Sequence, residues 1–102
     1  EKTDEKGIPV LSTSSVTDIS QTTAVSGGII TSDGGAIVMA RGVCWSIDQT
    51  PTVSDKKTTD GSGAGEFSSI LNDLSPGTNY YLRAYATNSA GTGYGSTMAF
   101  ST

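Results

Sequence analysis

The 102-residue chain contains 13 Gly and no His, and its formal net charge is −4. A chain of this length holds one compact domain and has no room for a second. The acidic balance argues against the basic footprint that nucleic acids and anionic membranes require, and the absence of His excludes a His-based catalytic triad and a His-ligated metal.

Charged residues gather at the amino-terminal end of the chain. Of the 16 charged side chains (6 Lys and Arg, 10 Asp and Glu), five lie in residues 1–6. Such a segment is typical of a solvated linker or tail. We therefore expect a flexible linker or tail at residues 1–8 and one folded domain at residues 9–102.

Short β-strands explain the rest of the pattern. The chain has 15 Ser and 15 Thr beside its glycines, a composition that suits strands joined by tight turns. No stretch places apolar residues at helical spacing over three turns. Strands are predicted at residues 10–19, 22–31, 37–47, 67–71, 78–88 and 96–102. Six or seven short strands separated by turn signals predict an all-β, antiparallel β-sandwich.

A turn signal separates the second and third predicted strands. Ser32-Asp33-Gly34-Gly35 supplies glycines at positions where a hairpin connection needs positive φ angles. We therefore expect residues 22–31 and 37–47 to form a β-hairpin. Small residues on one face of the second strand, among them Gly28, leave volume that the indole of Trp45 is expected to fill.

The third predicted strand contains a conflict of alternation. Arg41, Val43 and Trp45 share one parity, so a regular strand would put an arginine on the same face as the tryptophan. An interior glycine often marks a bulge, so Gly42 is expected to shift the alternation and leave Arg41 outside. Cys44 then points away from the core. As the only cysteine it forms no internal disulfide, and with no His to activate it we interpret it as a structural thiol.

The predicted strand at residues 78–88 has the clearest alternation. The core face carries Tyr80, Leu82, Ala84 and Ala86, and the solvent face carries Tyr81, Arg83, Tyr85 and Thr87. Tyr81, Arg83 and Tyr85 are candidate partner-facing residues, because tyrosine and arginine are enriched at interfaces. Tyr94, in a Gly-rich loop, is a further candidate. The alternative is that these side chains pair across strands, shield the sheet or anchor a loop.

Acidic and glycine-rich segments give no strong sign of chemistry. Residues 60–66 lack the flanking strand, helix and Lys-Ser/Thr ending of a phosphate loop and are interpreted as a flexible turn. Asp60 and Glu66 supply too few oxygens for Ca²⁺. Asp33, Asp60 and Asp73 lie in turns, where Asp commonly bonds to local backbone. A hydrolase using two carboxylates stays open as a remote alternative.

The segment Leu74-Ser75-Pro76-Gly77-Thr78-Asn79-Tyr80 matches the L-x-P-G-T-x-Y pattern of fibronectin type III modules. Together with Arg41-Gly42-Val43-Cys44-Trp45-Ser46, it makes residues 9–102 resemble the fibronectin III-like repeats of bacterial surface and secreted proteins. The resemblance implies a seven-stranded sandwich of immunoglobulin-like topology, in which Tyr80 is the tyrosine corner, its hydroxyl bonding to backbone upstream. Its structural signature residues are Trp45, Gly28, Leu74, Pro76, Gly77, Tyr80 and Leu82. One departure is that Gly28 occupies the usual place of the tryptophan, which here is Trp45 on the third strand.

The expected function follows from this resemblance and from the absence of chemistry. We expect a non-catalytic spacer or interaction domain of a bacterial cell-surface or secreted multidomain protein, with any lipid anchor elsewhere in that protein. Its partners would be neighbouring domains of a longer chain, and the isolated domain would be a monomer. No cofactor, metal, nucleic-acid partner or direct membrane insertion is expected. The alternative is a glycan- or protein-binding module that uses Tyr81, Arg83, Tyr85 and Tyr94.

Overall fold

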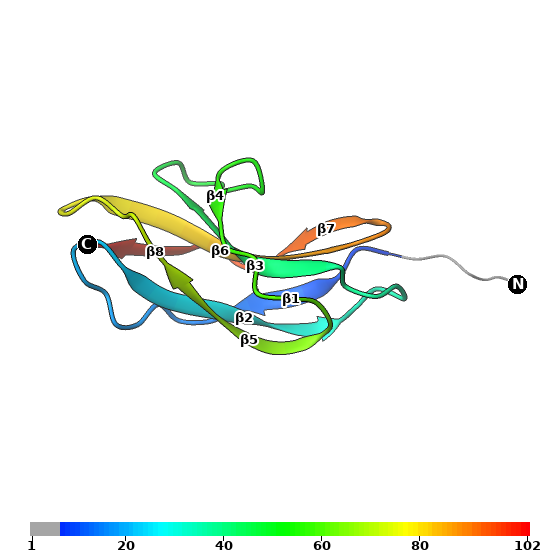
Figure 1. The fold of residues 1–102 in the computed structure, drawn as a ribbon. Helices are drawn as coiled ribbons and strands as arrows, with labels where there is room; N and C mark the ends of the chain where they lie inside the picture. Colours follow the sequence, from blue (N-terminus) through cyan, green and yellow to red (C-terminus); the bar gives the residue numbers. More distant parts are fainter. Residues whose placement is uncertain (1–6) are drawn as a thin grey trace, which may run out of the picture.

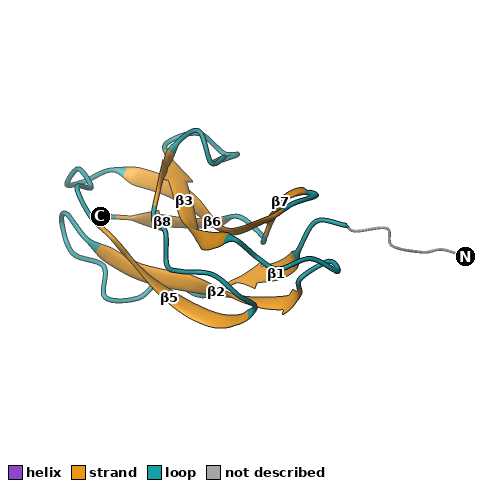
Figure 2. Ribbon diagram, turned by 45° about the vertical axis from the view of Figure 1, so that its right-hand side comes forward, coloured by secondary structure: helices purple, strands orange, loops and turns teal. Residues whose placement is uncertain are grey.

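A computed structural model describes residues 7–102 as two facing layers of β-strands (Figures 1 and 2). All pairings between strands are antiparallel, and the described residues include no helix. The predicted antiparallel β-sandwich is confirmed. The strands are β1 (Val10–Thr13), β2 (Ala24–Ser32), β3 (Ala40–Ser46), β4 (Lys56–Lys57), β5 (Gly65–Leu71), β6 (Asn79–Asn88), β7 (Gly91–Tyr94) and β8 (Met98–Ser101).

One layer is a three-stranded sheet in the order β1-β2-β5. The inner face of β2 is built from small residues and one isoleucine, all buried as the alternation predicts. Opposite them, Phe67, Ser69 and Leu71 of β5 turn inward at the same register. The buried members of β2 on this face are Ala24, Ser26, Gly28 and Ile30.

The other layer is a five-stranded sheet in which β6 lies between β3 and two shorter strands, β7 and β8. Both short strands pair with the edge of β6 opposite β3. Between the paired residues Tyr94 and Met98 lie residues 95–97, whereas β6 has only Arg83 and Ala84 between the corresponding partners. β7 and β8 are therefore two halves of one edge strand broken by one extra residue. Counted this way, the sandwich has the seven strands that the sequence predicts.

The expected hairpin between residues 22–31 and 37–47 is wrong. β2 and β3 lie in different sheets, and residues 33–39 cross from one layer to the other. The local turn chemistry exists, since Gly35 N–H donates to Asp33 Oδ1 at 2.9 Å. However, the turn leads into a crossing in which Ile37 is 78% exposed, and β3 then pairs with β6. A turn signal fixes local backbone shape but not the strand that the chain pairs with next.

The bulge expected at Gly42 is also wrong. The pairing of β3 with β6 runs without a register shift from Ala40↔Thr87 to Ser46↔Tyr81, so Arg41 stays on the face of Val43 and Trp45. Its guanidinium lies 5.2 Å from the centre of the Phe67 ring. Arg41 is tolerated there because its Nε donates to Asp60 O at 3.1 Å and a terminal nitrogen donates to Gly63 O at 3.2 Å.

Gly42 has a different role, because a Cβ at this position would collide with the carbonyl group of Thr58. Thr58 N–H donates to Val43 O at 2.9 Å, and Asp60 N–H donates to Arg41 O at 2.6 Å. Residues 58–60 thus bond along the free edge of β3. The glycine permits this close approach of two backbones.

Gly28 leaves room for other neighbours than the one expected. A Cβ here would lie 2.7 Å from Ala84 Cβ and 3.1 Å from Phe67 Cζ, and Trp45 is not among its nearest contacts. The three atoms nearest to this position thus belong to residues other than Trp45, the expected neighbour. The missing side chain instead lets β2 approach β6 while Phe67 fills the space beside it.

The first strand is shorter than predicted. β1 stops at Thr13, and only an isolated bridge, Thr17↔Val25, continues the pairing. The hydroxyl of Thr13 accepts a hydrogen bond from Ala84 N–H of the other sheet at 3.0 Å. At the amino-terminal end, Gly7 N–H donates to Gly34 O at 2.8 Å, so residue 7 of the expected linker contacts the domain. The rest of the expected linker, residues 1–6, lies outside the described residues.

Candidate functional site

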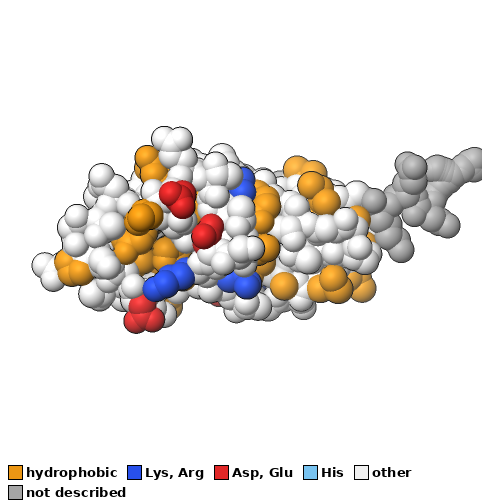
Figure 3. Space-filling view, turned by 90° about the horizontal axis from the view of Figure 1, so that it is seen from above, with side chains coloured by type: hydrophobic (Ala, Val, Ile, Leu, Met, Phe, Trp, Pro, Cys, Tyr) orange, Lys and Arg blue, Asp and Glu red, His pale blue; other side chains and the backbone are white. Residues whose placement is uncertain are grey.

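The outer face of β3 and β6 carries three of the four predicted partner-facing residues. The connection that includes β4 folds over this face, and the view from its side shows a largely uncharged surface with a few acidic and basic groups (Figure 3). Tyr85 is only 2% exposed beneath the connection, and its hydroxyl donates to Thr58 O at 2.5 Å. The predicted exposure of Tyr85 is therefore wrong. Alternation gave the correct face of the strand, but residues distant in sequence cover that face.

Arg83 and Tyr94 are engaged with each other. The guanidinium carbon of Arg83 lies 3.8 Å from the centre of the Tyr94 ring, and its Nε donates to Pro51 O at 2.5 Å. The Tyr94 hydroxyl accepts a hydrogen bond from Val53 N–H at 3.1 Å. This Arg83–Tyr94 pair holds residues 51–53 against the sheet, which is the loop-anchoring alternative. Tyr81 is half-buried on the same face.

Cys44 lies under the same connection. It is fully buried, and its Sγ lies 3.5 Å from Arg83 O. Burial raises the pKa of the Cys44 thiol above its ordinary value of 9.0, and burial likewise raises the pKa of Tyr85 above 10.0. A thiol that stays protonated is a poor nucleophile.

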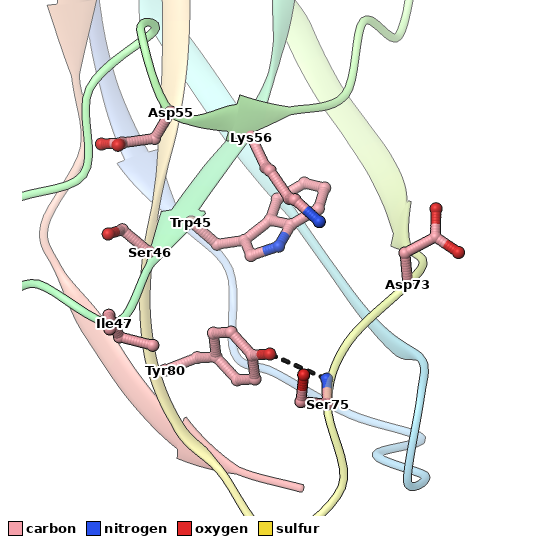
Figure 4. Close-up of a pocket in the computed structure, with 8 residues that line it drawn as sticks. All are labelled: Trp45, Ser46, Ile47, Asp55, Lys56, Asp73, Ser75 and Tyr80. Carbon is pink, nitrogen blue, oxygen red and sulfur yellow. Dashed lines mark hydrogen bonds between the residues drawn. The ribbon is translucent and has the colours of Figure 1, made fainter.

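A cleft opens where β4 and the β5–β6 connection come together (Figure 4). We call it the Trp45 cleft. It consists of two cavities of about 240 and 310 Å³ that share Trp45, Lys56 and Asp73. Trp45 and Lys56 are direct partners in the pairing of β3 with β4, so their side chains lie on the same face.

The indole of Trp45 is the chemically unusual feature of this cleft. Trp45 is 6% exposed, and its Nε1–H is the one buried side-chain polar group of the described residues that has no hydrogen-bond partner. Leaving a buried donor unpaired costs about 1–3 kcal/mol. In Figure 4 the nitrogen lies on the edge of the ring that faces the space between Lys56, Asp73 and Tyr80. Sequence reasoning assigned Trp45 to the core and missed this edge, because alternation says nothing about which ring atoms stay unpaired.

Tyr80 forms the opposite wall of the cleft. Its phenol oxygen accepts a hydrogen bond from Ser75 N–H at 2.8 Å, five residues upstream. The Tyr80 ring stacks on Phe100 with centroids 5.6 Å apart. These contacts fix the β5–β6 connection to the sheet and so set the width of the cleft.

Carboxylates are not brought together in this cleft. The side chains of Asp55 and Asp73 point away from each other in Figure 4. Asp60 lies elsewhere, where its Oδ2 accepts hydrogen bonds from the hydroxyls of Thr58 and Ser69. Among residues 7–102 no three His, Cys, Asp or Glu side chains gather as metal ligands. The same residues include no helix that is long and apolar enough to cross a membrane.

Comparison with known proteins shows similarity in fold. No family model and no curated protein matches the chain. Among solved structures, a fibronectin III domain of human collagen XX is 14% identical, covers 100% of this chain and 99% of its own, and superimposes with a TM-score of 0.66. A fourth fibronectin III domain of a human protein is 24% identical over 97% of this chain and 80% of its own, with a TM-score of 0.63.

The chain has the fibronectin type III fold. A bacterial structure is similar as well. The sensor domain of the anti-sigma factor RsgI4 of Pseudobacteroides cellulosolvens is 16% identical, covers 94% of this chain and 95% of its own, and has a TM-score of 0.63. In this fibronectin type III fold, the bond from Ser75 N–H to Tyr80 has the form of a tyrosine corner.

The remaining signature residues surround that corner. Leu74 is buried and its N–H donates to Thr22 O at 3.0 Å. Gly77 has a φ of 63°, a left-handed conformation that favours glycine. Pro76 O accepts a hydrogen bond from the Thr78 hydroxyl at 3.1 Å, and Leu82 is fully buried. The signature residues of the β5–β6 connection thus shape the turn that leads into β6.

Proposed function

We propose that this chain is a non-catalytic module that spaces or connects larger units in a cell-surface or secreted multidomain protein, as the resemblance to bacterial surface repeats implies. The observation that carries the proposal is the placement of the two chain ends. The described chain enters the sandwich at one end, before β1, and leaves at the opposite end after β8 (Figure 1). Modules with this geometry join end to end without folding back on one another.

Features of the surface and the interior support the proposal. Ser and Thr dominate the composition, and only 16% of the residues are charged, which suits a module with few strong attractions for its surroundings. Cys44 is buried and the carboxylates of the cleft diverge. A likeness in fold to a domain of collagen XX agrees with a modular role.

The partner-binding alternative draws less support from its four residues than their sequence positions suggest. Tyr85 is buried, and Arg83 and Tyr94 bind each other and residues 51–53. Tyr81 remains as a single half-buried tyrosine.

Small-angle X-ray scattering of one copy and of two directly fused copies tests the proposal. The ten residues of β6 extend about 34 Å at the usual rise per residue, so an end-to-end pair should be longer than one copy by about that amount. A fused pair that lengthens by less than about half of this has folded back on itself. That result would contradict the spacer geometry.

A further inference from the structure

The Trp45 cleft has the composition of a small-ligand site. Its two cavities, about 240 and 310 Å³, share three residues and together reach the size range of known ligand pockets. The walls combine apolar surface from Trp45, Ile47 and Tyr80 with polar groups from Lys56 and Asp73. A few polar groups converging on a partly apolar hollow is the usual pattern of such sites.

The unpaired indole N–H indicates what the ligand must provide. Trp45 Nε1 only donates, and the ammonium group of Lys56 beside it in the sheet pairing also only donates. Lys56 therefore cannot satisfy the indole, and an oxygen acceptor is the kind of atom to which both groups can donate. Asp73 lies across the cleft in Figure 4 with its carboxylate turned away from Trp45, and its side chain offers acceptors only. A ligand that both accepts and donates hydrogen bonds therefore matches the polar groups that line the cleft.

The charges around the cleft favour a neutral ligand. Lys56 and Lys57 supply two positive charges, and Asp55 and Asp73 supply two negative charges. This balance gives neither an anion nor a cation an overall electrostatic advantage. Hydroxyl groups donate and accept at the same atom, so a polyhydroxylated molecule fits this arrangement of donors and acceptors.

We propose that the Trp45 cleft binds one neutral sugar unit, with a sugar oxygen accepting from Trp45 Nε1 and Lys56 and a sugar hydroxyl donating to Asp73. The apolar face of the sugar packs against the Tyr80 and Ile47 side of the cleft. This inference goes beyond the spacer role, which requires no ligand. It also assigns binding to a different surface from the Tyr81, Arg83, Tyr85 and Tyr94 face.

The single tryptophan of the chain makes the test direct. In nitrogen-15 NMR spectra the indole N–H of Trp45 gives one resonance, because the sequence contains one Trp. Methyl glycosides of glucose, galactose, mannose and N-acetylglucosamine are titrated separately, and a blocked dipeptide amide serves as the competing probe. We expect at least one glycoside to shift the indole resonance in a saturable manner at up to about 50 mM, the range of weak single-unit binding.

Two substitutions distinguish glycoside binding in the cleft from unspecific effects of removing a negative charge. Asp73→Asn keeps the size of the side chain but removes its charge, and it should weaken glycoside binding about fivefold or more. Asp18→Asn is the matched control, because Asp18 is also an exposed Asp with positive φ (51° against 60° for Asp73) and does not line the cleft. Binding by the Asp18→Asn variant should equal that of the unchanged chain.

Three results would overturn the proposal. The first is an indole resonance that no glycoside shifts up to about 50 mM. The second is a shift caused by the dipeptide amide but by none of the glycosides, which would assign the cleft to peptide. The third is an equal weakening by Asp73→Asn and Asp18→Asn. The scattering result for the fused pair is independent of all three, so the spacer role and the sugar site fail separately.

Discussion

At the scale of single residues, polar atoms buried in this small domain are nearly all paired, and their partners come from distant parts of the chain. Arg41 reaches Asp60 and Gly63, and Thr13 reaches Ala84 in the other sheet. Trp45 Nε1 is the exception among the described residues. The sequence shows which residues are polar, but such partners are known only once the chain is folded.

Removal of the Tyr80 hydroxyl tests the tyrosine corner. Tyr80→Phe leaves Ser75 N–H without its acceptor, and because Ser75 is exposed, water compensates in part. We expect a loss of about 1 kcal/mol in the free energy of unfolding, measured by urea denaturation. Tyr81→Phe, on the outer face, is the control and should change stability by less than about 0.5 kcal/mol. Equal midpoints for the two variants would show that the corner adds no stability.

Two buried acids predict the response of stability to high pH. Burial raises the pKa of Cys44 and of Tyr85 above 9.0 and 10.0, so the folded state keeps protons that the unfolded state releases. Their contribution is complete below about pH 9 and decreases as the pH rises through the folded pKa values. Urea denaturation between about pH 8 and 11 should show falling stability. The double variant Cys44→Ala with Tyr85→Phe should show a smaller decrease, and an identical slope would contradict this origin.

At the scale of strands, the sequence predicts well which side chains of a strand share a face. It predicts poorly which of these faces another segment of the chain covers. The core face of β6 is correct at Tyr80, Leu82, Ala84 and Ala86, because period-two alternation is a property of the strand itself. Tyr85 was misjudged because a connection with no periodicity covers the other face. The Trp45 cleft escaped prediction for the same reason, since it arises where β4 and the β5–β6 connection come together.

Because β2 packs closely against β6, a larger side chain at Gly28 should lower the stability of the domain. Gly28→Leu would force a side chain between Ala84 and Phe67 and should destabilise the domain by about 1–3 kcal/mol or more. Ser68→Ala, at an exposed position of β5, should be close to neutral in the same denaturation experiment. If Gly28→Leu leaves the free energy of unfolding unchanged, the two sheets can move apart without an energetic penalty, and this prediction is wrong.

The Arg83–Tyr94 pair should limit how often the connection that covers Cys44 opens. Tyr94→Ala removes both the ring under Arg83 and the acceptor for Val53 N–H, so residues 51–53 should open more often. The rate at which a thiol reagent labels Cys44, the only cysteine, should rise about tenfold under native conditions. Tyr81→Ala serves as the control. An unchanged labelling rate in Tyr94→Ala would show that other contacts hold the connection.

At the scale of the whole molecule, the fold could be predicted and the candidate site could not. Regular turn signals and the segment 74–80 predict the sandwich, and the two layers in Figure 2 agree with it. The binding face chosen from exposed Tyr and Arg is occupied by the protein's own connection. The cleft at Trp45 depends on side chains from β3, β4 and the β5–β6 connection, whose relative placement the sequence does not state.

The broken edge strand formed by β7 and β8 limits how another chain could pair with this edge of the sheet. An uninterrupted outer strand is a template on which another chain can add its own strand and start aggregation. Here the register changes at residues 95–97, so a straight foreign strand cannot bond along both halves. The opposite edge of the same sheet is occupied by β4 and by residues 58–60. Backbone irregularity therefore interrupts the β7–β8 edge of the five-stranded sheet.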